Sequence, residues 1–162
     1  DYLYLFFLGT NTYHALSKTN TPVLLIPDGA LYSDIHKMVY AFDYLRERKL
    51  PLGPLLDFTT TLNCELSVLQ VMEEAHSKKA DEDVQELQFI LKSRIDEGVH
   101  IQFDTIRSAD VANSINNYIL TNEPDALALC LQHRNIIETL FHKSIIKNIT
   151  AICSYPVFVF HE

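Results

Sequence analysis

Glycine is scarce in this sequence. The 162 residues include four glycines, Gly9, Gly29, Gly53 and Gly98, and none follows Gly98. Phosphate loops of the Walker and Rossmann types need glycines, because their backbone N–H groups must approach a phosphate closely. The part of the chain after Gly98 therefore cannot contain a loop of either type.

Cysteine is also scarce, and long apolar runs are absent. Three cysteines, without CxxC spacing, do not make a disulfide framework. No apolar run approaches the roughly 20 residues needed to cross a bilayer. The stretch Tyr2 to Leu8 is preceded by Asp1 instead of a basic segment and lacks a cleavage site, so no signal peptide is expected. We expect a cytoplasmic protein without a membrane-spanning segment.

Other kinds of function lack a signal in the residues. The net charge of −8 disfavours binding to nucleic acid or to anionic membranes, because both depend on an excess of Lys and Arg. The seven histidines show no spacing typical of metal ligands, so no metal site is expected. No G-x-S-x-G motif is present, and catalysis has no positive signal.

The sequence does contain short β-rich runs that alternate with amphipathic segments, a pattern typical of βαβ units. We predict an α/β domain over residues 37–162, an open, doubly wound five-stranded parallel sheet with helices on both faces. The expected strands are Met38–Phe42, Glu65–Met72, His100–Thr105, Ala126–Leu131 and Pro156–Phe160, and the expected helices are Pro51–Asn63, Asp81–Glu97, Ala109–Leu120 and Asn135–Cys153. Asp110 or Ser108 is available to cap the start of the helix 109–120.

Residues 1–36 resemble the end of the predicted domain. The stretch TPVLLIP (21–27) parallels YPVFVFH (155–161), since each is a proline followed by a short apolar strand. Upstream, DYLYL parallels DALAL (125–129) in three of five positions. We interpret residues 1–36 as the last strand, helix and strand of a preceding copy, plus a linker, before a complete copy at 37–162.

The order of these segments resembles that of the universal stress proteins. The resemblance rests on KMVYAFDYL (37–45), ELSVLQV (65–71) and HRNIIETLFHKSIIKNITAICSYPVFVFHE (133–162). It is closest to a tandem member, with a C-terminal copy preceded by the tail of an N-terminal one. The resemblance implies the open α/β fold, a role in the cellular stress response and, as in many members, binding of ATP or AMP, with Mg²⁺ only alongside the nucleotide.

Two candidate binding residues follow from this resemblance. Asp43 would meet the adenine or the ribose, and the backbone of Val71 would contact the base. Both follow or end a strand, and ligands of open α/β sheets bind at the carboxyl ends of the strands. A carboxylate after a strand can equally be a turn residue or a helix cap, so Asp43 keeps both interpretations. Val71 is expected in the core under either.

The family's phosphate loop, G-x2-G-x9-G-[ST], is degenerate here. Its positions fall on Cys130, His133, Lys143 and Ser144, so only the hydroxyl is retained. Two interpretations stay open. Either the C-terminal copy does not bind nucleotide, or the cationic groups of His133, Arg134, His142 and Lys143 bind an anion by charge.

In the N-terminal remnant, Gly9 and Thr10 preserve the end of the motif, which makes the first copy the better candidate for a nucleotide site. Its alignment leaves ten residues missing between Leu5 and Phe6. Two functions therefore stay open. One is a stress protein that binds ATP or AMP mainly through the N-terminal copy, and the other is a ligand-free dimerisation and interaction module. Slow ATP hydrolysis would rest on family analogy alone.

The two strands that follow a proline are predicted to pair with each other. In the family, the closing strands of two copies pair antiparallel across a twofold axis, and an uncovered apolar edge would be a liability. We expect Val23–Ile26 to pair with Val157–Phe160. The expected partners are thus another copy of the domain and a protein whose identity the sequence does not give.

Overall fold

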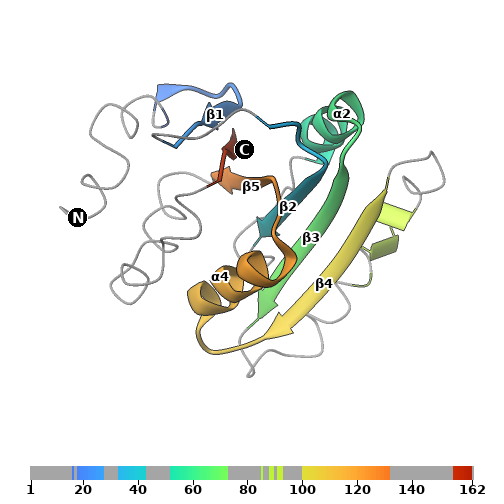
Figure 1. Ribbon diagram of the computed structural model, residues 1–162, viewed down its shortest axis with the longest axis vertical. Helices are drawn as coiled ribbons and strands as arrows, with labels where there is room; N and C mark the ends of the chain where they lie inside the picture. The colour runs from blue at the N-terminus through green and yellow to red at the C-terminus, as the bar shows by residue number, and fades with distance from the viewer. Residues whose placement is uncertain are drawn as a thin grey trace.

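The computed structural model describes residues 16, 18–27, 33–42, 52–72, 85, 88, 89, 91, 92, 100–131 and 155–161. Its six strands form one sheet in the order β1-β6-β5-β2-β3-β4 (Figure 1). The strands are β1 (Val23–Leu25), β2 (Lys37–Phe42), β3 (Glu65–Met72), β4 (Ile101–Arg107), β5 (Ala126–Leu131) and β6 (Val157–His161), and the two helices with defined bounds are α2 (Leu52–Leu62) and α4 (Val111–Asn122).

The five predicted parallel strands are confirmed, two with identical bounds and three with ends that differ by one or two residues. The sheet is larger than predicted, because β1 adds a sixth strand that runs antiparallel to β6. Helices α2 and α4 confirm the helices expected over 51–63 and 109–120. Within the expected helix 81–97, the described residues are helical, whereas the expected helix 135–153 lies outside the described residues.

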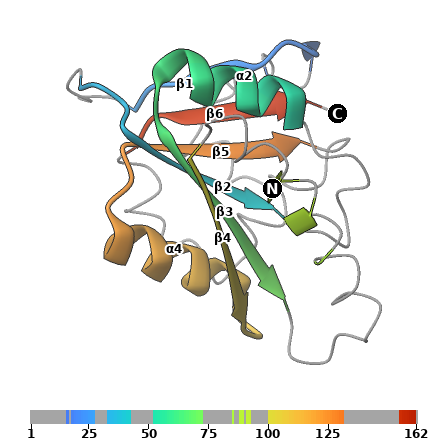
Figure 2. The same ribbon diagram turned by 90° about the vertical axis from the view of Figure 1, so that its right-hand side faces the viewer.

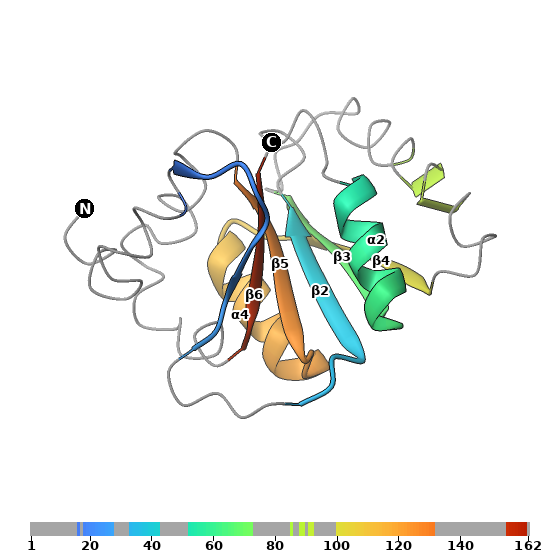
Figure 3. The ribbon, with the colours of Figure 1, turned by 90° about the horizontal axis from the view of Figure 1, so that it is seen from above.

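The sheet separates two apolar layers, and each helix covers one of them (Figure 3). We call these the α2 face and the α4 face. Because strand side chains alternate, Met38 and Tyr40 of β2 lie on the α2 face, and Val39 and Ala41 lie on the α4 face. All four side chains are at most 7% exposed. A strand buried on both faces is a continuous apolar run, which explains the sequence of β2.

Helix α2 forms although Pro54 lies in its first turn and three threonines lie near its end. Proline is tolerated there, because the first N–H groups of a helix have no partner within it. The hydroxyl of Thr59 donates to the carbonyl of Leu56 at 3.0 Å, and that of Thr61 donates to the carbonyl of Asp57 at 2.7 Å. Thr59 and Thr61 therefore satisfy their hydroxyl groups within the helix, and Thr59 is buried.

Helix α4 begins at the cap that the sequence suggested. The Asp110 carboxylate accepts a hydrogen bond from the backbone N–H of Asn113 at 3.1 Å, and the Ser108 hydroxyl accepts one from the N–H of Asp110 at 3.1 Å. Ile115 and Ile119 then face the sheet and are buried. Both candidate cap residues thus take part in starting the helix.

The antiparallel pairing of β1 with β6 confirms the predicted contact between the two closing strands. Val23 pairs with Val159, Leu24 with Phe158, and Leu25 with Val157. In the sequence alignment of 21–27 with 155–161, Val23 corresponds to Val157, Leu24 to Phe158 and Leu25 to Val159. In the sheet, Leu24 thus lies opposite its own counterpart, whereas Val23 and Leu25 each lie opposite the counterpart of the other. The register is therefore the one that a twofold axis through the central pair would produce.

Candidate functional site

The strand order reverses between β2 and β5, and the sheet opens at this point. From β2 the chain builds outward through β3 and β4, whereas β5 and β6 lie on the other side. The two central strands pair over three residues only, Met38–Tyr40 with Ala126–Ala128. Beyond these pairs they diverge toward their carboxyl ends (Figure 2). Such a switch point is where open α/β sheets bind ligands.

Each of the diverging strands keeps its outer neighbour. Phe42, the last residue of β2, still pairs with Gln70 of β3, and Leu131, the last residue of β5, still pairs with His161 of β6. The opening is therefore confined to one edge of one strand pair. We take this carboxyl edge as the candidate site.

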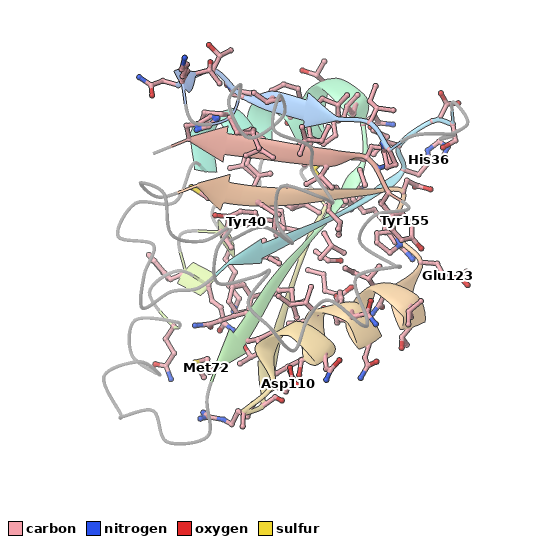
Figure 4. The ribbon with its side chains drawn as sticks, turned by 90° about the vertical axis from the view of Figure 1, so that its left-hand side faces the viewer. His36, Tyr40, Met72, Asp110, Glu123 and Tyr155 are labelled. Atoms are coloured by element: carbon pink, nitrogen blue, oxygen red, sulfur yellow. The ribbon has the colours of Figure 1, made fainter. Side chains whose placement is uncertain are left out.

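The opposite, amino edge of the same strand pair is tied together. One carboxylate oxygen of Asp125 accepts hydrogen bonds from the backbone N–H groups of His36 and Lys37, both at 2.9 Å. The N–H of Asp125 in turn donates to the carbonyl of Lys37 at 2.8 Å. His36 and Glu123 lie at this edge, whereas Met72 and Asp110 lie at the other (Figure 4). Charge-assisted bonds of this kind fix how β2 and β5 start relative to each other.

Val71 lies at the candidate site, and its side chain belongs to the core, as the sequence predicted. It is 7% exposed and packs on the α4 face. At the start of β3, the backbone N–H of Glu65 donates to the carbonyl of His36, which precedes β2, and the N–H of Leu66 donates to the carbonyl of His100, which precedes β4. Odd-numbered residues of β3 therefore direct their backbone groups toward β2. The backbone of Val71 therefore faces β2, one residue beyond the last registered pair of those strands.

Gln70 is a residue of this edge that the sequence reasoning missed. Its side chain is 2% exposed, and its Oε1 atom has no hydrogen-bond partner. An amide inside the apolar run ELSVLQVM, at a position that alternation places in the core, was the signal that could have identified it. A second buried amide, Asn116 of α4, also has an unpartnered Oδ1 atom and is 8% exposed.

A polar network on the α4 face joins α4 to the outer strands. The Tyr118 hydroxyl donates to the Asp104 carboxylate, which also accepts a hydrogen bond from the Gln102 amide at 3.1 Å. Burial and the bond to Asp104 raise the pKa of Tyr118 to about 12, against a smaller opposing effect of a hydrogen bond from Ser67. Tyr118 therefore stays protonated at neutral pH, and the network holds α4 on the sheet.

Two further titratable groups have shifted pKa values. Burial lowers the pKa of His161, whose Nε2 atom is buried without a partner at the carboxyl end of β6. Burial, and to a smaller extent the negative charge of Asp125, raises the pKa of the Cys64 thiol, opposed by a backbone hydrogen bond. Cys64 and Cys130 are buried and free of disulfides. In the described part of the chain, no three His, Cys, Asp or Glu side chains gather closely enough to hold a metal ion.

The other predicted binding residues lie outside the described residues, namely Gly9, Thr10, Asp43, His133, Arg134, Lys143 and Ser144. In the chain, Asp43 directly follows Phe42, and His133 comes two residues after Leu131. In the sequence, two of the predicted segments thus follow the two strands that border the opening. The described residues also include no helix long and apolar enough to cross a membrane.

No family model matches this chain, and no curated protein matches it. Solved structures do. A universal stress protein from Archaeoglobus fulgidus is similar with a TM-score of 0.69 and 17% identity, over 99% of this chain and 56% of that one. A protein assigned as a universal stress protein from Pseudomonas aeruginosa gives a TM-score of 0.53 and 15% identity, over 94% of this chain and 56% of that one.

These comparisons confirm the fold that the sequence resemblance implied: the chain has the fold of the universal stress proteins. This chain spans 56% of the length of both solved structures.

Proposed function

We propose that this chain is a stress-response module of the universal stress protein type that binds an adenine nucleotide at the carboxyl edge between β2 and β5. The observation that carries the proposal is the opening of the sheet at its switch point, where the pairing of these strands stops after Tyr40 and Ala128. Ligands of open α/β sheets occupy such openings, because loops from both halves of the sheet reach them.

The backbone of Val71 supports a base at this edge. The register assigns its N–H to the ladder with Phe42, whereas its C=O faces β2 beyond the last β2–β3 pair, where it would accept a hydrogen bond from a base. Asp43, which follows Phe42, is the residue proposed to meet the adenine or the ribose. Because the chain lacks glycine at positions 130, 133 and 143, the phosphates would rely on His133, Arg134 and Lys143 instead of a backbone cradle.

Isothermal titration of the full chain with adenosine, AMP and ATP tests this proposal. We expect binding, with Asp43→Ala weakening it at least tenfold and Asp57→Ala, which removes an exposed carboxylate on α2, leaving Kd unchanged. A weak dependence of Kd on the number of phosphates is expected from the glycine-free loop. Binding that Asp43→Ala does not change would move the site to Gly9 and Thr10, and no binding at all would refute the proposal.

A second function is favoured by the β1–β6 register. We propose that the chain also serves as a tandem or dimeric interaction module, with residues 1–36 belonging to a preceding copy. On the α2 face, Phe158 is 5% exposed and its counterpart Leu24 is 43% exposed, while Phe160 is 1% exposed and its counterpart Ile26 is 67% exposed. A second copy against β1 would cover these two apolar side chains.

Analytical ultracentrifugation tests the interaction function. We expect the chain to self-associate, and the double variant Leu24→Lys with Ile26→Lys to sediment as a monomer. Leu120→Lys is the matched control, because Leu120 is 56% exposed but lies on α4. If the wild type is monomeric at high concentration, or if the control dissociates it equally, β1 is not the interface. With monomeric wild type and no nucleotide binding, neither function survives.

A further inference from the structure

Gln70 lies where β3 continues past the end of β2. It pairs with Phe42 on one side and with Thr105 of β4 on the other, and it is the last residue of β3 flanked by registered pairs on both sides. From Val71 onward, the described pairing of β3 is with β4 alone. A ligand that lies across the end of β2 therefore meets these two consecutive residues of β3.

The side chain of Gln70 is set apart by its burial and by its unpaired oxygen. It shares the α2 side of β3 with Leu66 and Val68, both apolar and fully buried. At 2% exposure its carboxamide is withdrawn from bulk solvent, and its Oε1 accepts no hydrogen bond. Leaving a buried acceptor unsatisfied is costly, and an apolar side chain of the same shape would avoid that cost. A hydrogen-bond donor that comes and goes, such as a ligand, would explain why an amide stands here.

We propose that Gln70 is a specificity-determining residue of the nucleotide site, and that its Oε1 atom accepts a hydrogen bond from the exocyclic amino group of adenine. The inference rests on the proposed function, and it adds the element that selects the base. Hypoxanthine presents a carbonyl oxygen at this position, which would face Oε1 acceptor to acceptor. A site that hydrogen-bonds an amino group rejects a base that lacks it, because its own polar group is then left unpaired.

The test compares three nucleosides on the full chain by isothermal titration: adenosine, inosine, and purine riboside, which has no exocyclic group. The wild type should bind adenosine at least tenfold more tightly than either of the others. In Gln70→Met, which keeps the length of the side chain without its acceptor, the preference should fall to within about threefold. The purine riboside comparison uses wild-type protein, so it gives a result even if the variant fails to fold.

Asn116→Leu is the matched control. Asn116 is also a buried amide with an unpartnered oxygen, but it lies in the middle of α4 and not at the carboxyl edge. Its loss should leave the preference for adenosine intact. The preference must also not depend on the phosphates, so AMP against IMP should give the same ratio as adenosine against inosine.

The outcomes separate this inference from the proposed function. If adenosine binds but purine riboside binds equally well, or Gln70→Met keeps the full preference, Gln70 does not read the base, and its partner is a buried water or none. The nucleotide site itself would then stand. If the wild type binds none of the three nucleosides or their monophosphates, the proposed function fails, and the inference fails with it.

Discussion

The two faces of the sheet are held by different means. On the α2 face, the ring of Phe58 contacts those of Phe158 and Phe160 edge to face, with centroid distances of 5.4 and 5.8 Å. On the α4 face, smaller aliphatic side chains fill the core, and hydrogen bonds around Tyr118 and Asp104 fix the helix. Aromatic side chains contribute much free energy through the area that they bury, whereas single hydrogen bonds contribute less but define the position of the helix.

This difference bears on the candidate site. The chain passes from α4 through Asp125 into β5, and β5 borders the opening at the switch point. Helix α4 and the Asp125 bonds therefore set how β5 lies against β2. The α2 face supplies the bulk of the core, and the α4 face together with the amino edge supplies the alignment. Four predictions follow, and each tests one side of this comparison.

The largest effect is expected from Phe160→Ala, on the α2 face. The side chain is 1% exposed, and its loss should lower the free energy of unfolding by about 3–5 kcal/mol, through lost transfer energy and a residual cavity. Val159→Ala, at the neighbouring position on the α4 face, should cost about 2 kcal/mol. Urea denaturation measures both. Equal losses would show that the two faces contribute alike.

A loss of this size is a large share of the free energy of unfolding of a typical domain, so Phe160→Leu is the milder variant of the same position. We expect it to cost about 1 kcal/mol. A double-mutant cycle of Phe160→Leu with Phe58→Leu then measures the coupling energy between the two rings. Edge-to-face pairs contribute about 0.5–1.5 kcal/mol beyond the buried area. A coupling near zero would leave the aromatic contacts with no role beyond filling space.

The next effect concerns Tyr118→Phe on the α4 face. Removing the hydroxyl breaks its bonds with Asp104 and Ser67 and should cost about 1 kcal/mol at pH 7. The folded pKa of about 12 lies above the ordinary value of 10.0. The stabilisation is therefore fully present below pH 10 and is lost as the pH rises from 10 to 12.

Denaturation of wild type and Tyr118→Phe between pH 7 and pH 11.5 checks this dependence. The difference in the free energy of unfolding between them should shrink above pH 10, because the wild type then loses the stabilisation by the protonated hydroxyl, which the variant lacks. Taking the difference removes the contributions of the other tyrosines and lysines. A difference that stays constant up to pH 11.5 would contradict the role of the hydroxyl as a donor to Asp104.

A third prediction concerns the start of α4. Asp110→Ala removes the side-chain cap on the N–H of Asn113 and should cost about 1 kcal/mol, while Asp110→Asn, which keeps an acceptor, should cost a few tenths. Thermal unfolding at equal protein concentration measures both. If Asn is as harmful as Ala, the charge near the helix N-terminus matters more than the hydrogen bond.

The sequence predicted most of this fold because apolar alternation and helical periodicity are local properties. The strand 65–72 was predicted with its true bounds, and the cap at Asp110 followed from the residue type. The contacts that align the elements were not predictable in the same way. Asp125 and His36 are 89 residues apart, and neither residue indicates the other. Periodicity gives the face of a residue, but not the register of its strand.

For the candidate site, the sequence placed Val71 near the carboxyl end of its strand and in the core, because the strand pattern fixes both. It did not identify Gln70: the position of an amide within an apolar strand indicates its burial, but only the structure shows that its oxygen lacks a partner. The network of Asp104 with Tyr118 was missed for the same reason. The role of a polar side chain depends on its neighbours in the fold, and the sequence alone does not identify them.

The smallest effect is expected at the two helix ends. Asn63 after α2 and Glu123 after α4 both adopt left-handed backbone conformations, with φ of 52° and 45°. At the end of α2, the backbone N–H of Cys64 donates to the carbonyl of Thr59, and that of Asn63 donates to the carbonyl of Thr60. These are the two bonds of a Schellman motif. At the end of α4, the described residues make one such bond, from the backbone N–H of Glu123 to the carbonyl of Ile119.

Glycine adopts this conformation without strain, asparagine adopts it with little strain, and glutamate adopts it at a larger cost. Glu123→Gly should therefore raise the free energy of unfolding by about 0.5–1 kcal/mol, and Asn63→Gly should change it by a few tenths at most. Urea denaturation can resolve the two, with Glu123→Ala as the control that removes the carboxylate but keeps the strain. A gain in the alanine variant equal to that in glycine would mean that the Glu123 charge, and not its backbone, weakens the end of α4.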